Sequence, residues 1–133
     1  KCEKWALVEN DEFEIVGIFL PTSMEYIYNF EFGPLNADTG EVETSVRTRN
    51  SNYRIVLRKA CDVIYEFLMR QPGCMVRFSG LDESRNRLFA IWMNVNWELM
   101  TSRFFMYGYN SLQRWELYRK RGRYDAVLLK LKR

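Results

Sequence analysis

Apolar and polar residues alternate in steps of two along the first part of the chain, a pattern typical of β-strands. Phe13 to Phe19 is a β-rich run that ends at Pro21, and aromatic residues fill every second position from Tyr26 to Phe32. Val42 to Thr48 alternates in the same way after the turn-forming residues Asp38 to Gly40. The pattern therefore predicts three strands, of which the second and third pair through that turn.

The apolar period changes to three and four residues between Tyr53 and Gln71, which predicts an amphipathic helix. A residue between Asn50 and Asn52 can cap the start of this helix, and Pro72 ends it. The polar residues of this helix occupy a single narrow row, in which neighbours are four positions apart in the sequence. We therefore expect a long central helix that lies largely buried on the sheet.

The rest of the chain predicts one more helix and four more strands. The helix has its apolar period between Leu88 and Leu99, although Asn94 and Asn96 weaken it. The expected strands are Cys74 to Ser79, Phe104 to Tyr109, Gln113 to Arg119 and Arg123 to Leu131. The order is β-β-β-α-β-α-β-β-β, in which strands and helices cluster rather than alternate. This order predicts an α+β fold with two helices and a mainly antiparallel sheet, in a single domain over residues 1–133.

Histidine is absent from the 133 residues, which excludes several classes of enzyme. Ser-His-Asp and Cys-His catalytic systems, His-ligated zinc hydrolases and histidine-based pH switches all need this side chain. Cys2, Cys61 and Cys74 are an odd number without close spacing, so they predict neither a disulfide framework nor a Cys-x-x-Cys metal site. We expect no metal and no cofactor, and we expect Cys61 and Cys74 to be buried in a reducing compartment.

The hydropathy of the chain favours a cytoplasmic protein without a membrane segment. Its longest apolar run, Ile15 to Pro21, is far shorter than the roughly 20 residues of a spanning helix. Residues Lys1 to Asn10 have no signal-peptide pattern.

Charge is distributed unevenly along the chain, although the net charge is only +3. Residues 1–50 have a net charge of −6, residues 51–101 of +2 and residues 102–133 of +7. The last third also places aromatic rings among its cations, a combination that serves single-stranded nucleic acid because rings stack on bases while cations meet phosphates. The candidate residues there are Trp115 and Tyr118 as stacking rings, with Arg119, Arg121 and Arg123 as cations. The alternative is that these rings are core and the arginines form a solvated turn.

A second basic pair, Arg85 and Arg87, lies at the expected start of the second helix. Cations are mildly unfavourable beside the partial positive charge of a helix N-terminus. The pair therefore suggests that a phosphate or an acidic protein partner binds nearby. The alternative is that neighbouring carboxylates neutralise the two arginines.

Three functions follow from these patterns, in this order. The first is a macromolecule-binding module, with single-stranded nucleic acid as the first candidate. The second is a toxin-like ribonuclease of a toxin–antitoxin pair, because Arg, Lys, Tyr and carboxylate groups can together cleave a phosphodiester without histidine. The third is a protein–protein interaction module or homodimer that uses the aromatic strand Tyr26 to Phe32. The sequence favours a binding protein over an enzyme and identifies no catalytic residue.

Several short segments of the chain together carry a family resemblance. They are Tyr28 to Gly33, Arg49 to Asn52, Val56-Leu57, Tyr65 to Phe67, Ser79-Gly80, Ser84 to Phe89, Tyr107-Gly108 and Tyr124 to Lys130. On these segments the chain resembles a family of short bacterial proteins, common in Bacteroidetes, that is known only as a domain of unknown function. The resemblance covers about four-fifths of the chain, from about Tyr26 to Arg133. Two departures are Pro34, where the family has Asp after the glycine, and Asn52 with Tyr53, where it has Gly and Asp. The resemblance implies a bacterial cytoplasmic protein and brings no established activity.

Overall fold

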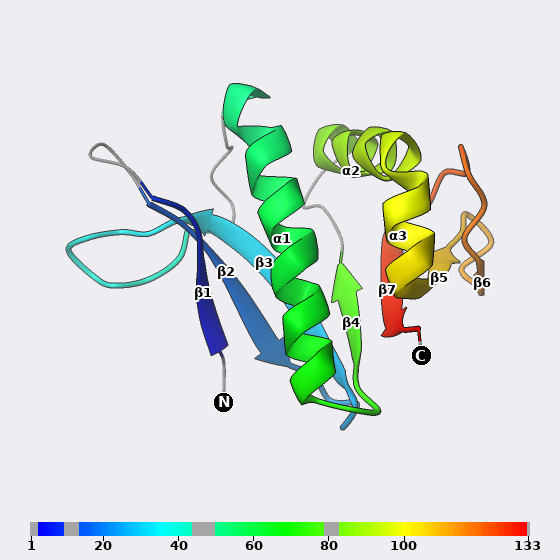
Figure 1. The fold of residues 1–133 in the computed structure, drawn as a ribbon, viewed down its shortest axis with the longest axis horizontal. Coiled ribbons are helices and arrows are strands. Elements are labelled where there is room, and N and C mark those ends of the chain that lie inside the picture. The colour runs from blue at the N-terminus through cyan, green and yellow to red at the C-terminus, as the bar shows by residue number, and fades with distance from the viewer. Residues whose placement is uncertain (1–2, 10–13, 44–49, 79–82, 133) are drawn as a thin grey trace.

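The structure is a computed structural model, and it describes residues 3–9, 14–43, 50–78 and 83–132. Within these residues, seven strands form one sheet, and three helices pack on one of its two faces (Figure 1). The strands are β1 (Glu3–Glu9), β2 (Glu14–Pro21), β3 (Ile27–Pro34), β4 (Met75–Phe78), β5 (Phe104–Tyr109), β6 (Trp115–Leu117) and β7 (Ala126–Leu131). The helices are α1 (Asn50–Arg70), α2 (Glu83–Val95) and α3 (Trp97–Arg103).

The sheet is mixed and mostly antiparallel, in the order β1-β2-β3-β4-β7-β5-β6. Among the strand pairs of the described residues, β3–β4 alone is parallel, and α1 makes the crossover that a parallel pair requires. The last strand, β7, lies inside the sheet, antiparallel to β4 on one side and to β5 on the other. The β5–β6 hairpin is therefore joined to the rest of the sheet through β7.

The predicted fold, with two helices and one long central helix, is wrong. The expected second helix is two helices, because the chain bends at Asn96 between α2 and α3. The backbone of Asn96 leaves the helical region there, with φ −104° and ψ 30°. Its side-chain amide and its backbone N–H both donate hydrogen bonds to the carbonyl oxygen of Trp92, four residues earlier, at 2.9 and 3.0 Å. The helical layer thus consists of α1 over one part of the sheet, with α2 and α3 beside it (Figure 1).

Two strands at the start of the chain also differ from expectation. The predicted first strand corresponds to β2, and β1 precedes it without having been expected. The predicted strand from Val42 to Thr48 is represented in the described residues by an isolated bridge between Leu35 and Val42. Residues 44–48 of that prediction lie outside the described residues. The turn before Val42 forms because the Asn36 side-chain oxygen accepts hydrogen bonds from two backbone N–H groups.

The core lies between the sheet and α1. Phe19 of β2 stacks on Phe67 of α1 with ring centroids 3.9 Å apart, and Tyr28 of β3 meets the same ring edge-on. Phe30 and Phe32 of β3 are 2% and 8% exposed on this side of the sheet. Phe30 and Phe32 are therefore core, whereas Tyr26, the first ring of the strand predicted for a homodimer, is 58% exposed. The homodimer itself stays a prediction.

Candidate functional site

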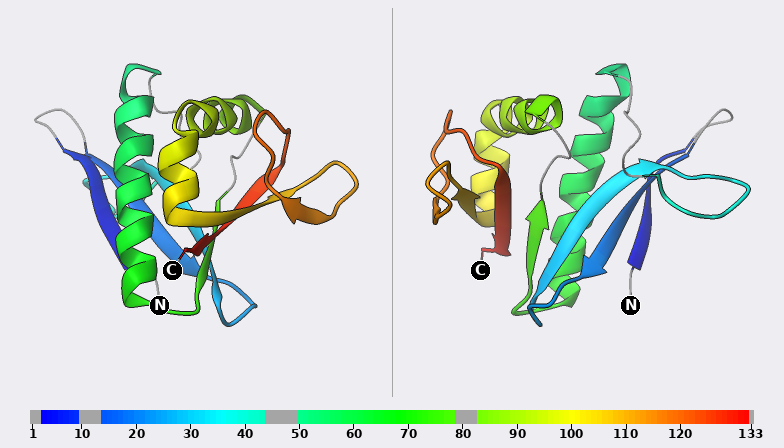
Figure 2. Two further views of the ribbon diagram at one scale, coloured as in Figure 1. Left: turned by 45° about the vertical axis from the view of Figure 1, so that its right-hand side comes forward. Right: turned by 180° about the vertical axis from the view of Figure 1, so that it is seen from behind.

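One face of the sheet is left uncovered by the three helices. Side chains along a strand alternate between the two faces, so residues next to the core positions point the other way. Figure 2 shows this face in the view from behind, with the strands in front of the helices. We call it the open face; on β4, β7, β5 and β6 it consists of Met75, Arg77, Ala126, Leu128, Lys130, Phe105, Tyr107, Tyr109, Trp115 and Leu117.

The strand register aligns the open-face residues in rows across the sheet. One row crosses six strands and consists of Leu20, Asn29, Arg77, Leu128, Tyr107 and Leu117. A second row joins Met75, Lys130 and Phe105. Residues from the middle and the end of the chain therefore lie beside one another on this face.

Aromatic rings gather on the open face of β5 and β6. Phe105, Tyr107 and Tyr109 occupy every second position of β5, and Trp115 faces Tyr109 across the β5–β6 pair. The Tyr109 and Trp115 rings lie 5.1 Å apart at 55°. Phe105 and Trp115 are each 42% exposed, which is unusual for large apolar side chains. The rings thus present accessible faces to one side of the sheet.

Lys130 of β7 pairs with Phe105, and Arg77 of β4 lies one strand further along the sheet, separated from Tyr107 by Leu128. No carboxylate lies among these residues on the described β4, β7, β5 and β6 residues of the open face. Arg77 of β4 and Lys130 of β7 are both exposed. Lys132, just beyond β7, places its Nζ 5.3 Å from the Phe105 ring centroid and donates a hydrogen bond to the Thr101 carbonyl oxygen. This part of the open face combines stacking surface with positive charge.

The two rings predicted from the sequence are separated by the sheet. Trp115 lies on the open face, whereas Tyr118 is 8% exposed and packs against Trp97 and Tyr124 in the helical layer. Burial raises the pKa of the Tyr118 hydroxyl to about 12. A ring so enclosed has no free face for a base, so Trp115 is the ring of the two that is available for stacking.

The predicted arginines lie toward α2 rather than on the open face. The backbone N–H of Arg121 donates a hydrogen bond of 3.0 Å to Asn94 Oδ1 near the end of α2. Arg87 lies seven residues before Asn94, on the same side of that helix. The structure therefore brings Arg87 and the turn of Arg119 to Arg123 to one side of the molecule. The Arg85 side chain lies outside the described residues.

A hydrogen-bond network fixes the start of this arginine turn. Glu116 Oε1 accepts from the Asn110 amide at 2.7 Å, and Oε2 accepts from the Tyr124 hydroxyl at 2.8 Å. Those bonds, with Arg119 Nε 3.3 Å from Oε2, hold the pKa of Glu116 below its usual value. A carboxylate with a lowered pKa is a poor general base. The group has the residue types of the predicted ribonuclease, but its contacts are those of a structural network.

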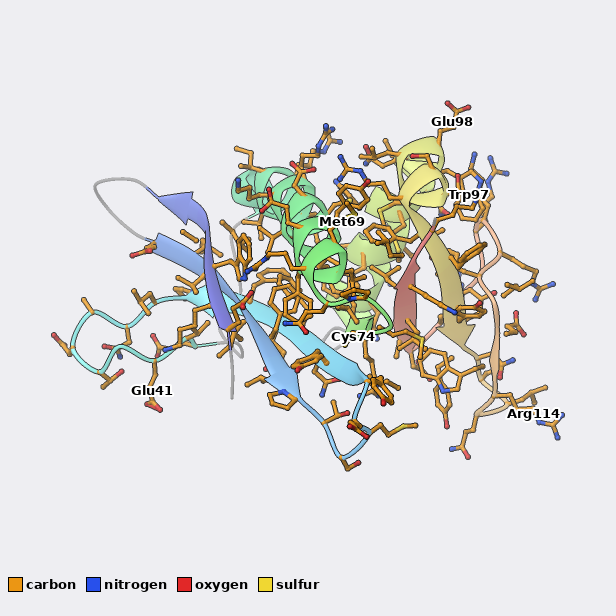
Figure 3. All side chains as sticks on the ribbon, turned by 60° about the horizontal axis from the view of Figure 1, so that its bottom comes forward. Glu41, Met69, Cys74, Trp97, Glu98 and Arg114 are labelled. Carbon is orange, nitrogen blue, oxygen red and sulfur yellow. The ribbon has the colours of Figure 1, made fainter. Side chains whose placement is uncertain are left out.

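Sequence reasoning missed Phe105, Arg77 and Lys130 as site residues. The sequence signal that could have identified Phe105 is the alternation in β5. Phe105, Tyr107 and Tyr109 share one side of this strand, whereas the other side consists of one ring and two residues without rings. No local signal connects Arg77 to these rings, because only the pairing of β4 with β7 brings it near them. Arg114 is also basic and lies in the β5–β6 turn, at the outer end of the hairpin (Figure 3).

Two classes of feature are absent from the described residues. Among them, no group of three or more His, Cys, Asp or Glu side chains is placed to hold a metal ion. No helix in this part of the chain is long and apolar enough to cross a membrane.

The fold and the site together define a small protein with one mixed sheet, three helices on one face and an aromatic, basic surface on the other. The chain belongs to the family of unknown function DUF6934, whose model matches residues 7–132. This confirms the family resemblance seen in the sequence. No curated protein and no solved structure shows a significant match to the chain.

Proposed function

We propose that this protein binds single-stranded nucleic acid on the open face of its sheet. The observation that carries the proposal is the group of rings Phe105, Tyr107, Tyr109 and Trp115, which share one face with Arg77 and Lys130. Every base has a flat π-face, so rings on a sheet bind single strands with little dependence on sequence. The cations contribute by meeting the phosphates between the bases.

The geometry favours a single strand over a duplex. Bases in a duplex are stacked on each other and present only their edges, whereas bases of a single strand can turn outward onto protein rings. The accessible groups on the open face of β5 and β6 are ring faces and ring edges. Leu117 lies beside them and is 68% exposed. Such a surface matches unstacked bases and offers a duplex few contacts.

Binding is tested with the full chain and a fluorescently labelled oligonucleotide of about ten nucleotides, a length within the usual site size of sheet-based binders. Fluorescence anisotropy at two salt concentrations should show binding that weakens as salt rises, because phosphate contacts release counterions. A duplex of the same sequence should bind more weakly. The absence of salt-sensitive binding at micromolar protein would rule out the proposal.

Two ring variants with a matched control locate the site. We expect Tyr107→Ala and Trp115→Ala each to weaken binding by about fivefold to a hundredfold, which is the measured range for loss of one base–aromatic stack. Ile55→Ala is the control, because Ile55 is 58% exposed on α1, on the other face of the sheet. If all three variants bind equally well, the nucleic acid binds elsewhere on the protein.

A further inference from the structure

A depression of about 270 Å³ lies at the end of the sheet, next to the rings of the open face. The turn of Pro72 to Cys74, between α1 and β4, forms one wall. Phe105 and Lys130 form the other wall, and Leu68 and Leu131 complete the lining. Figure 3 shows Cys74 in this turn, beside the end of β7.

The lining of this depression suits a flat, largely apolar group attached to an anion. Phe105 and the two leucines offer apolar contact area, and Lys130 is its one charged lining residue. Lys132 lies near the same ring, since its Nζ is 5.3 Å from the Phe105 centroid, and it adds a second cation. A nucleobase with its phosphate has these two properties, because a π-face packs on rings while the phosphate meets ammonium groups.

Phe105 belongs both to the depression and to the open face. It is the first of the three rings along β5, and Tyr107 and Tyr109 follow at every second position. A single-stranded nucleic acid that lies along the rings of β5 therefore reaches the depression at Phe105. The last base of this nucleic acid can turn into the space between the Phe105 ring and the turn of Pro72 to Cys74.

We infer that the depression between the α1–β4 turn and Phe105 is a subsite for the terminal nucleotide of a bound single strand. This inference rests on the proposed function. The base packs against Phe105, and its phosphate lies near Lys130. The site is thus a pocket at one end of an otherwise open surface, which gives the bound strand a fixed end.

The thiol of Cys74 reports on occupancy of the subsite. Cys74 is partly exposed and lines the depression, whereas Cys61 is 4% exposed in the core. The full chain is treated with N-ethylmaleimide, with and without a saturating oligonucleotide of about ten nucleotides. Peptide mass spectrometry then gives the rate of modification at each cysteine. We expect the oligonucleotide to slow modification of Cys74 at least fivefold and to leave the rate at Cys61 unchanged.

The outcomes separate the subsite from the proposed function. An oligonucleotide that binds by anisotropy but leaves Cys74 equally reactive overturns the subsite and keeps the open-face proposal. An oligonucleotide that does not bind at all overturns both. Protection of Cys74 by a free mononucleotide at the same concentration as the oligonucleotide would show a separate nucleotide site, and would overturn the assignment to a strand end.

A variant that fills the depression gives a second, independent measurement. We expect Cys74→Trp to weaken oligonucleotide binding about tenfold, because the indole occupies the space of the base. Ile91→Trp is the matched control, because Ile91 is 52% exposed on α2, away from the depression. Circular dichroism verifies that each variant is folded, and equal affinity of a folded Cys74→Trp would overturn the inference.

Discussion

Phe104 and Phe105 are consecutive residues of β5 that have opposite surroundings. Phe104 points toward the helices, is 2% exposed and meets the Tyr65 ring of α1 edge-on. Phe105 points to the open face and is 42% exposed. The side chain is the same, so the difference comes only from which face of the sheet a helix covers. An aromatic ring of β5 is therefore buried in the core or accessible for binding according to which face of the sheet its position in the strand points to.

The rings of the two faces also differ in how far they are enclosed. On the helix side Phe78 and Phe89 stack with centroids 4.2 Å apart and are 7% and 6% exposed. On the open face Tyr109 and Trp115 also pack on each other, but Trp115 stays 42% exposed, and Lys130 pairs with Phe105. Enclosed rings stabilise a fold, whereas exposed rings beside a cation can stack on the bases of a charged polymer. This contrast can be tested directly.

The largest expected effect is the difference in stability between the two phenylalanine variants. Phe104→Ala should lower the free energy of unfolding by about 3–5 kcal/mol, because it removes a fully buried ring and leaves a cavity. Phe105→Ala should lower it by less than about 1 kcal/mol, as surface substitutions usually do, and should instead weaken oligonucleotide binding. Urea denaturation measures both values. Equal losses of stability would show that the open face is not a free surface.

A substitution at Gly108 tests the helix side of the same strand. The Tyr124 ring lies so close against Gly108 that an added methyl group would overlap with the ring. Gly108→Ala should therefore cost about 1–3 kcal/mol of stability through overpacking. The cost should shrink in a Tyr124→Ala background, which removes the ring. A cost that is unchanged in the double variant would show that the Tyr124 contact is not its cause.

The cations of the open face should set the salt dependence of binding. Arg77→Gln and Lys130→Gln should each reduce the slope of log affinity against log salt by about 0.7, the value for one phosphate contact with a single strand. Arg54→Gln is the control, because Arg54 is an exposed residue of α1 on the other side of the sheet. Slopes that are identical in all three variants would place the phosphates away from Arg77 and Lys130.

The smallest expected effect is the pH dependence that Glu116 contributes to stability. Hydrogen bonds from Asn110 and Tyr124 hold the folded-state pKa of Glu116 below its usual value of 4.5. The stabilisation is therefore present above that usual value and is lost as the pH falls through the lower folded-state value. Urea denaturation from pH 7 to pH 3 should show a small stability gap between the wild type and Glu116→Gln that closes at low pH. A gap that widens at low pH would contradict the lowered pKa.

Local patterns predicted much of the secondary structure but not the layering. The period of three and four residues between Tyr53 and Gln71 predicted a helix where α1 lies. The fold prediction nevertheless failed, because the backbone leaves the helical conformation at Asn96 while the apolar period continues from Leu88 to Leu99, so the period alone does not separate α2 from α3. The strand β1 was missed because its short run carries two charged residues in its first two positions.

The candidate site was less predictable, because it depends on pairing between distant segments. Trp115 could be proposed from the mixture of rings and cations in the last third of the chain. The burial of Tyr118 could not, since Trp97 of α3 and Tyr124 enclose it only after the chain folds back. Arg77 belongs to the site only because the register of the β4–β7 pair places it opposite Leu128 of β7. A pattern in one segment identifies which residues share a face, and the sheet order decides which faces become one surface.

The position of β7 inside the sheet has a consequence for how the protein folds. β7 follows all six other strands in the chain, yet it lies between β4 and β5. As the chain leaves the ribosome, β4 and the β5–β6 hairpin have no mutual pairing until residues 126–131 have been made. Pairings between distant segments slow folding, because the loop between them must close first. The open face thus exists as one surface only after β7 has paired with both of its neighbours.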